Sequence, residues 1–247
     1  MKRFWLTLLP LATLALVLLP YRAAYGLGPL DGKIIALDAG HGGEEWGATY
    51  PANADASTVL IKEKDVNLAV VYALKSKLEK DGGASVVLTR EGDEYLPSRR
   101  ERVEIAISKC ESSAGRKCDA LVSVHHNGSV DPGYDGLLVI YNERQDLALA
   151  KAVHDALEVG VSHPPGGSCS PYNWTDEGLR NGGYGMTVYG HLVSIITEAY
   201  YITNECEGQY FQANAANRKA RIAEEVNAIY SGLANYFSAQ SGGRPGR

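Results

Sequence analysis

The most restrictive feature of the sequence is a short apolar run that ends in a glycine-rich turn carrying a histidine. Residues 34–37 read Ile-Ile-Ala-Leu, and residues 38–43 continue as Asp-Ala-Gly-His-Gly-Gly. The apolar run predicts a buried strand, and the glycines predict a turn whose backbone can approach another group closely. His41 would then lie at the carboxyl end of a strand, where open α/β sheets bind their ligands.

Strand-like and helix-like patterns alternate along the rest of the chain. Apolar runs predict strands, and apolar positions that recur every three or four residues predict helices. Predicted strands cover residues 33–39, 85–90, 120–124, 137–141 and 193–200, and predicted helices cover residues 64–80, 97–108, 146–157 and 213–237. This alternation predicts a single α/β domain with a twisted, mostly parallel or mixed sheet and helices on both faces.

Two segments lack any periodicity. Residues 161–184 are rich in Gly, Pro, Ser and aromatic residues, and we expect a long loop that is either functional or disordered. Residues 238–247 form a polar tail rich in Gly, Ser and Arg, which we expect to be disordered. The folded domain would then comprise residues 27–237.

The N-terminus has the pattern of an export signal. Lys2 and Arg3 precede a mostly apolar stretch over residues 4–19, and Ala-Tyr-Gly at residues 24–26 offers a cleavage site. We therefore predict a signal peptide over residues 1–26 and an exported protein, located in the periplasm, outside the cell or at the cell wall. The alternative is an uncleaved membrane anchor, although spanning a bilayer needs about 20 apolar residues.

Loss of this signal would make the chain more acidic. The full sequence has a formal charge of −5, and removal of Lys2, Arg3 and Arg22 leaves −8. A protein this acidic has no general electrostatic attraction for nucleic acids or anionic membranes. We therefore expect no nucleic-acid partner.

The four cysteines form an even set in a chain that we expect to be exported, so disulfides are expected. Four cysteines allow three pairings. The short separation of Cys110 and Cys118 favours one bond between them and a second bond between Cys169 and Cys206. The alternative is a zinc site built from these thiols, but the irregular spacing lacks the paired Cys-x-x-Cys form.

Four side chains could converge at one rim of the predicted sheet. His41 follows the first strand, His125 ends the third, Glu63 opens the first helix and Glu198 lies in the last strand. Two imidazoles and a carboxylate suit a catalytic zinc ion, which takes three protein ligands and leaves one position for water. Zinc lowers the pKa of bound water towards about 7, and a further carboxylate can then act as general base.

On these residues the sequence resembles the zinc-dependent N-acetylmuramoyl-L-alanine amidases of the type-3 class. The resemblance extends from about residue 33 to residue 237 and rests on several separated motifs in the same order. They are Leu-Asp-Ala-Gly-His-Gly-Gly at 37–43, Glu-Lys-Asp-Val-Asn-Leu at 63–68, Val-Leu-Thr-Arg at 87–90 followed by Asp93, the segment 102–106, Ser-Val-His-His-Asn at 123–127, and Thr197-Glu198 with Asn204 beyond.

The resemblance implies that His41, Glu63 and His125 bind zinc and that Glu198 is the catalytic glutamate. It also implies hydrolysis of the amide that joins N-acetylmuramic acid to the L-alanine of the peptidoglycan stem peptide. The family usually has a small residue where this chain has His126. Because successive residues of a strand point to opposite faces, only one of His125 and His126 can face the metal, and His126 stays an alternative ligand.

Several polar and aromatic side chains are candidates for binding the substrate. Arg90 could hold a carboxylate of the stem peptide or pair with a neighbouring acidic residue. The aromatic candidates could line a groove for glycan or peptide, or form a small core of their own. The candidates are Arg90, Asn127, Tyr172 and Trp174, with Tyr184 and Tyr189 as further aromatic residues.

Two other functions stay open from the sequence. A catalytically silent wall-binding or regulatory module could share the fold, although such a relative would be expected to lack a ligand or the glutamate. A zinc peptidase acting on a different amide would use the same metal and base, so the motifs do not separate it. We expect zinc as cofactor, peptidoglycan as partner, and an activator protein as a further candidate partner.

Overall fold

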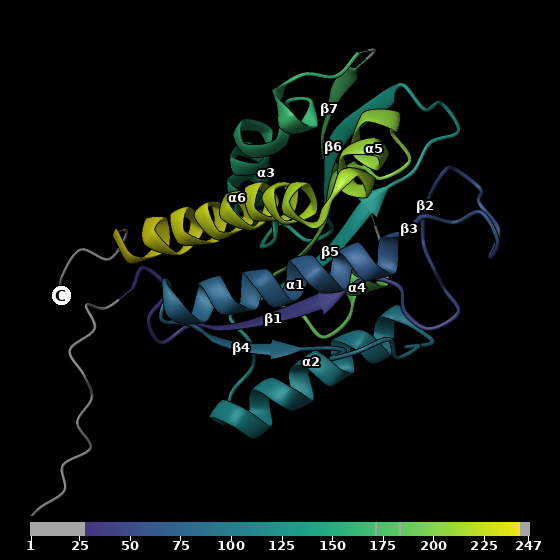
Figure 1. Cartoon of the computed structure of the whole chain (residues 1–247). Coiled ribbons are helices and arrows are strands. Elements are labelled where there is room, and N and C mark those ends of the chain that lie inside the picture. Colours follow the sequence, from purple (N-terminus) through teal and green to yellow (C-terminus); the bar gives the residue numbers. More distant parts are fainter. Residues whose placement is uncertain (1–27, 171, 183, 243–247) are drawn as a thin grey trace, which may run out of the picture.

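A six-stranded mixed sheet runs through the protein (Figure 1). The computed structural model describes residues 28–170, 172–182 and 184–242. The predicted signal peptide lies outside the described residues. Among the helices described, none is long and apolar enough to cross a membrane.

The strands and helices follow the alternation that the sequence predicts, and all five predicted strands are present. The strands are β1 (Ile34–Ala39), β2 (Thr49–Tyr50), β3 (Ile61–Lys62), β4 (Ser85–Leu88), β5 (Ala120–Asn127), β6 (Tyr134–Tyr141), β7 (Asn173–Asn181) and β8 (Ser194–Tyr201). The helices are α1 (Glu63–Lys80), α2 (Arg99–Ala114), α3 (Leu147–Val161), the 3-10 helix η1 (Pro165–Gly167), α4 (Gly185–Val188), α5 (Glu205–Ala213) and α6 (Ala215–Gly242).

The strand order in the sheet is β4-β1-β5-β8-β6-β7. The first four strands in this order are parallel to one another, β6 is antiparallel to β8, and β7 is parallel to β6. The sheet is therefore mixed, as predicted. Because β1 and β5 are parallel neighbours, the residues that follow them meet at one edge of the sheet.

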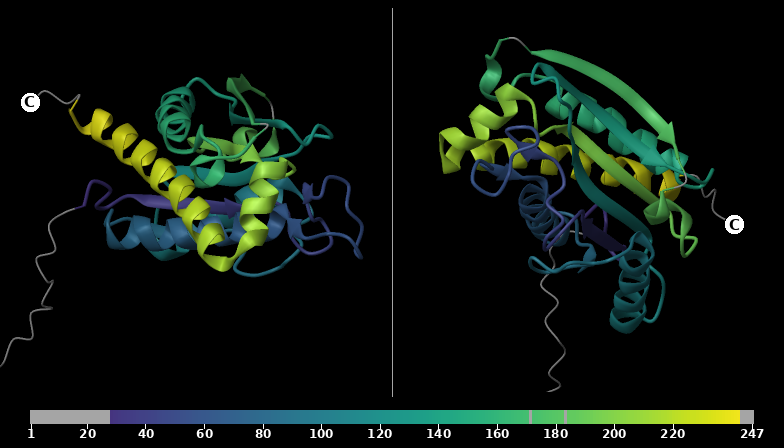
Figure 2. Two further views of the ribbon diagram at one scale, coloured as in Figure 1. Left: turned by 45° about the horizontal axis from the view of Figure 1, so that its top comes forward. Right: turned by 90° about the vertical axis from the view of Figure 1, so that its right-hand side faces the viewer.

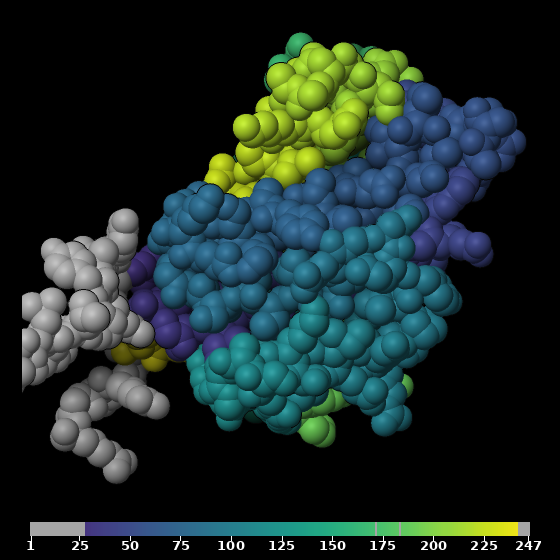
Figure 3. All heavy atoms as spheres, turned by 60° about the horizontal axis from the view of Figure 1, so that its bottom comes forward, coloured from purple at the N-terminus to yellow at the C-terminus, as the bar shows by residue number. Residues whose placement is uncertain are grey.

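Helices cover both faces of the sheet, as the alternation of apolar side chains requires (Figures 1 and 2). Ile35 and Leu37 of β1 lie in one core with α1, α3 and α6, whereas Ile34 and Ala36 lie in a second core with α2 and α4. Residues on both faces are buried, which explains why β1 reads as an unbroken apolar run. Figure 3 shows the blue surface of α1 between the yellow-green of α5 and α6 and the teal of α2.

The prediction of a long loop over residues 161–184 is wrong. This segment contains η1 and the nine-residue strand β7, which pairs with β6 at the edge of the sheet. The sequence of β7, Asn-Trp-Thr-Asp-Glu-Gly-Leu-Arg-Asn, is polar because most of the strand is at least partly exposed. An edge strand of this kind lacks the apolar run or clean alternation by which strands are predicted.

The helices at the C-terminus also differ from the prediction. Helix α6 corresponds to the predicted helix over residues 213–237, whereas α5 was not predicted, and Asn214 between the two has an extended backbone. The chain is still helical as far as Gly242, so residues 238–242 do not form the disordered tail that we predicted, and the domain continues past residue 237.

Helix α2 is longer than predicted and ends at Gly115, which adopts the left-handed conformation that favours glycine.

Two disulfides join the four cysteines in the favoured pairing. One links Cys110 at the end of α2 to Cys118, and the other links Cys169 to Cys206 in the first turn of α5. The alternative of a thiolate zinc site is therefore wrong. The second bond fixes the segment that precedes β7 to the helix that follows β8.

Candidate active site

The turn after β1 is held in place by buried polar side chains. Asp38 accepts hydrogen bonds from Arg102 at 3.0 Å, Thr89 at 2.5 Å and Ser123 at 2.6 Å. Burial alone would raise the pKa of Asp38, but the Arg102 guanidinium and the two hydroxyl groups hold it below its usual value. Arg102 also donates to the carbonyl of His41 at 2.7 Å, so the charged pair orients the histidine-bearing turn.

Three predicted metal ligands come together beside this turn. Glu63, the first residue of α1, has one carboxylate oxygen 3.1 Å from Nε2 of His41 and the other 3.0 Å from Nδ1 of His125. One ligand atom of each residue lies within 4.8 Å of the others. The arrangement fits a metal ion bound by two imidazoles and a carboxylate.

Two glycines permit this close approach. A Cβ at Gly40 would lie 2.2 Å from the His125 ring, and a Cβ at Gly47 would lie 2.2 Å from Oε2 of Glu63. Any side chain at either position would displace a ligand. The close backbone approach predicted for the turn that carries His41 is therefore confirmed at Gly40.

Three hydrogen bonds hold the Glu63 carboxylate in place. It accepts hydrogen bonds from the backbone amides of Ala48 at 2.8 Å and His126 at 3.1 Å, and from the Asn67 side chain at 3.2 Å. Burial opposes ionisation, but His125 and His41 hold the pKa of Glu63 well below its usual value. The Glu63 carboxylate is thus anionic although its side chain is only 4% exposed.

His126 points away from the metal ligands. Its ring is buried, 2.7 Å from the Asn67 side-chain oxygen and 3.0 Å from Oε2 of Glu225 on α6. His126 is therefore not part of the metal cluster, and the alternative that it binds the metal is wrong. Sequence reasoning missed Asn67 and Glu225 as supporting residues, although Asn67 follows Glu63 by one helical turn and so shares its face.

Glu198 lies beside the metal ligands on β8. In the sheet it is the register partner of His125 on β5. Burial, together with the charges of Glu63 and Glu177, raises the pKa of Glu198 well above its usual value. Among the described residues its buried Oε2 has no hydrogen-bond partner.

A cleft extends to both sides of these residues as two pockets. His41, His125 and Glu198 line both of them. One pocket, of about 670 Å³, is bounded by the start of α2 and by α4, and we call it the α2–α4 pocket. The other, of about 720 Å³, is bounded by the loop that contains Trp46 and by the end of β5, and we call it the Trp46 pocket.

The structure separates the predicted substrate-binding residues. Asn127 lines the Trp46 pocket, as do Glu198 and the metal ligands. Arg90 is buried and donates to four backbone carbonyls, including those of Ala39 and Gly40, so it stabilises the turn and is not free for a carboxylate. The prediction that Arg90 binds substrate is therefore not retained.

Tyr172 and Trp174 lie outside both pockets. Their rings stack 6.2 Å apart, and Trp174 packs against the main core. They form the small aromatic cluster that was the alternative prediction. Tyr184 and Tyr189, by contrast, line the α2–α4 pocket.

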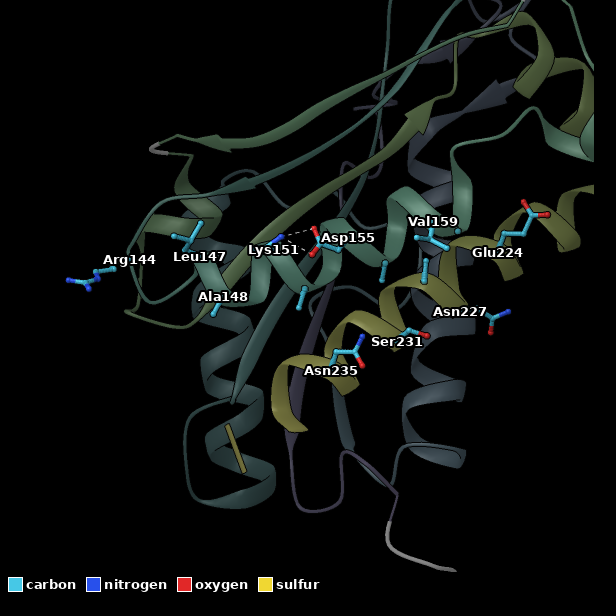
Figure 4. A pocket seen from close by; sticks show the side chains of 14 residues that line it. Arg144, Leu147, Ala148, Lys151, Asp155, Val159, Glu224, Asn227, Ser231 and Asn235 are labelled. Carbon is cyan, nitrogen blue, oxygen red and sulfur yellow. Dashed lines mark hydrogen bonds and ion pairs between the residues drawn. The ribbon is translucent and has the colours of Figure 1, made fainter. Parts of the chain in front are cut away.

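A larger pocket between α3 and α6 is a separate feature (Figure 4). It has a volume of about 1010 Å³, and its lining contains none of the predicted catalytic or metal-binding residues. Lys151 and Asp155 in this pocket pair with each other at 2.8 Å. It therefore provides no candidate chemistry.

The α/β fold thus brings three residues that could hold a metal ion and the Glu198 carboxyl group into one cleft, an arrangement that suits metal-dependent hydrolysis. The family profile of N-acetylmuramoyl-L-alanine amidases matches residues 35–235. The chain belongs to this family, and its enzyme class is that of peptidoglycan amidases.

Known proteins similar to the chain agree with this assignment. The uncharacterized protein YqiI of Bacillus subtilis is 28% identical over 96% of this chain and 99% of its own length. The probable cell wall amidase LytH of Staphylococcus epidermidis is 25% identical, and the match covers 90% of this chain but 64% of that protein. The CwlD amidase of Clostridioides difficile, solved in complex with the GerS lipoprotein, superposes with a TM-score of 0.60 at 25% identity, covering 84% of this chain and 99% of CwlD.

Proposed function

We propose that this chain hydrolyses the amide between N-acetylmuramic acid and L-alanine with a zinc ion held by His41, Glu63 and His125. The observation that carries the proposal is the convergence of these three ligands and Glu198 at the centre of one cleft. The donor set of two imidazoles and one carboxylate fits a catalytic zinc site, which leaves a position open.

The chemistry divides between the metal and the protein. Bound zinc would supply Lewis acidity, which polarises the scissile carbonyl and lowers the pKa of water. Glu198 accepts the proton of the attacking water at its carboxylate and then donates it to the nitrogen of the leaving amine. Its partly buried position at the cleft keeps this proton near the reacting atoms.

We further propose that the protein is exported and acts at the cell wall, with residues 1–26 as its signal or, if they are not cleaved, as its anchor. The basic and apolar N-terminal pattern and the similarity to a probable cell wall amidase support this proposal. An activator protein is a further proposed partner, supported by the complex of the CwlD amidase with a lipoprotein.

Mass spectrometry of digested peptidoglycan tests the reaction. The wild-type protein should release intact stem peptides with a free N-terminal L-alanine. Glu198→Ala should retain zinc and lose at least about 100-fold in rate, since it removes a general base. His41→Ala should lose zinc, whereas His154→Ala, on α3 outside the cleft, serves as the matched control.

Other digestion products would contradict the proposal in distinct ways. Shortened stem peptides would identify a peptidase, and unaltered peptidoglycan would indicate a silent binding module. Full activity of Glu198→Ala would remove this residue from the mechanism.

A further inference from the structure

The two pockets of the cleft differ in charge. Arg99, Arg100 and Arg102 line the α2–α4 pocket. The described residues that line the Trp46 pocket include no lysine or arginine. A substrate that crosses the metal site therefore meets arginine side chains in the α2–α4 pocket, whereas the Lys62 ammonium lies 4.0 Å from the centre of the Trp46 ring without lining the Trp46 pocket.

Two of these three arginines already have acidic partners. Arg102 is buried and pairs with Asp38 at 3.0 Å. Arg100 pairs with Glu104, one helical turn further along α2, at 2.7 Å. The positive charges of Arg102 and Arg100 are therefore already balanced within the protein.

Arg99 differs from both. It is exposed, and within the described part of the chain no acidic group lies in salt-bridge contact with its guanidinium. Its guanidinium lies 5.5 Å from the ring centre of Tyr184, a second residue of the same pocket. The side chain also packs on α4, because a Cβ at Gly185 would lie 2.8 Å from the Cβ of Arg99.

These contacts orient Arg99 without neutralising it. A guanidinium is planar, and its N–H donors suit a carboxylate bound through two hydrogen bonds. Three acidic residues also line this pocket: Asp38 pairs with Arg102 at 3.0 Å, Glu45 lies 4.0 Å from His41 at the metal end, and Glu198 lies beside His125 in the sheet.

We propose that Arg99, positioned over the Tyr184 ring, binds a free carboxylate of the stem peptide and so places the peptide in the α2–α4 pocket. The inference rests on the proposed amidase function. The stem peptide offers such a carboxylate on its second residue, D-glutamate, and on its third residue when that residue is diaminopimelate. The uncharged sugar would then occupy the Trp46 pocket, which contains no cationic side chain among its described lining.

Three synthetic muramyl peptides test the subsite and identify the carboxylate. The first carries D-glutamate followed by diaminopimelate, the second has the D-glutamate carboxylate amidated, and the third has lysine in place of diaminopimelate. For the wild-type enzyme, loss of the carboxylate that Arg99 binds should lower kcat/KM about tenfold, mainly through KM, because one charge-assisted pair is lost. In Arg99→Gln the three substrates should be hydrolysed with equal kcat/KM.

Two further variants make the result specific. Arg99→Lys keeps the charge but loses the planar donor pair, and should retain a reduced preference. Arg100→Gln removes the same charge from the next residue and should retain the full wild-type preference. Thermal unfolding of the zinc-loaded variants checks that each is folded.

Each remaining outcome contradicts a different statement. If Arg99→Gln discriminates among the substrates as the wild type does, Arg99 does not bind the carboxylate. If the wild type hydrolyses all three equally, the pocket has no carboxylate subsite. If the wild type hydrolyses none of them, the proposed amidase function itself fails.

Discussion

The pKa values of two carboxyl groups near the metal cluster are shifted in opposite directions. Asp38 is paired with Arg102 and hydroxyl groups, and its pKa is lowered, so it stays ionised and supports the turn. Burial and the charges of Glu63 and Glu177 raise the pKa of Glu198, and the Arg180 charge opposes them only in part. The different surroundings of the two groups thus give them different roles: Asp38 is a structural carboxylate, and Glu198 can take up and release a proton.

The raised pKa of Glu198 predicts how stability depends on pH in the metal-free protein. A carboxyl group whose folded-state pKa is raised contributes stability below its unfolded pKa, and this contribution is lost as pH rises through the folded-state pKa. Glu198→Gln cannot ionise, so it should match the metal-free wild type at pH 4 and exceed its melting temperature at pH 8. Thermal unfolding in the presence of a chelator measures both.

A matched substitution controls for the general effect of removing a carboxylate. Glu111→Gln changes an exposed residue of α2 and should follow the wild-type pH profile. If the difference between Glu198→Gln and wild type were the same at both pH values, the carboxyl group would not be ionising at a cost to the folded state.

At the scale of elements, strand β5 performs two tasks because its side chains alternate between the faces of the sheet. His125 joins the metal cluster, and the next residue, His126, reaches Glu225 on α6 through the opposite side. Asn67 connects the two sides, since its amide donates to Glu63 and its oxygen contacts His126. Helix α6 is thereby coupled to a metal ligand.

This connection predicts that His126 supports metal binding without touching the metal. His126→Ala leaves the Asn67 oxygen unpaired and the Glu63 carboxylate less firmly oriented. Zinc affinity should fall about 10- to 100-fold, the usual effect of losing a residue that orients a ligand. Competition with a chromogenic chelator measures this affinity directly and does not depend on catalysis.

Two further variants test the route of the effect. Asn67→Ala should weaken zinc binding in the same direction, because it removes the residue between His126 and Glu63. His154→Ala, outside the cleft, should bind zinc like the wild type. Wild-type affinity in a folded His126→Ala protein would show that His126 serves packing alone.

The elements also show which parts of the fold the sequence could predict. Strands β1 and β5 are buried on both faces, so their apolar runs were recognisable. Strand β7 is stabilised by pairing with β6 at an edge and carries mostly polar residues, so only tertiary pairing defines it. A local sequence pattern predicts a strand whose side chains are mostly buried, and it fails for an edge strand of which only a few side chains, such as Trp174, pack on the core.

At the scale of the molecule, the sequence predicted the cluster but only part of the walls of the cleft, since Asn127, Tyr184 and Tyr189 line it and Arg90, Tyr172 and Trp174 do not. His41, Glu63 and His125 sit at strand or helix ends, so topology brings them to one edge of the sheet. The position of Arg90 depends on how the turn after β1 and the start of α1 meet, and that of Arg99 beside Tyr184 depends on how α2 and α4 pack together. No spacing along the chain carries that information.

The dependence of the metal cluster on topology yields a last prediction, which concerns the stability of the whole molecule. His125 and Glu63 are 62 residues apart in sequence, so the unfolded chain presents no comparable site. The four cysteines, which could otherwise bind zinc when unfolded, are paired in disulfides. Zinc should therefore bind the folded state almost exclusively and stabilise it by about 2.7 kcal/mol at 100 times its Kd.

For a domain of this size, that free energy corresponds to a rise in melting temperature of about 5–10 °C. Calorimetry of the metal-free protein with increasing zinc should show the rise, and a chelator should reverse it. His41→Ala should show little shift over the same concentrations, because it removes one ligand of the cluster and leaves both disulfides intact. An equal shift in His41→Ala would place the stabilising ion elsewhere, and the assignment of this cleft as the metal centre would fail with it.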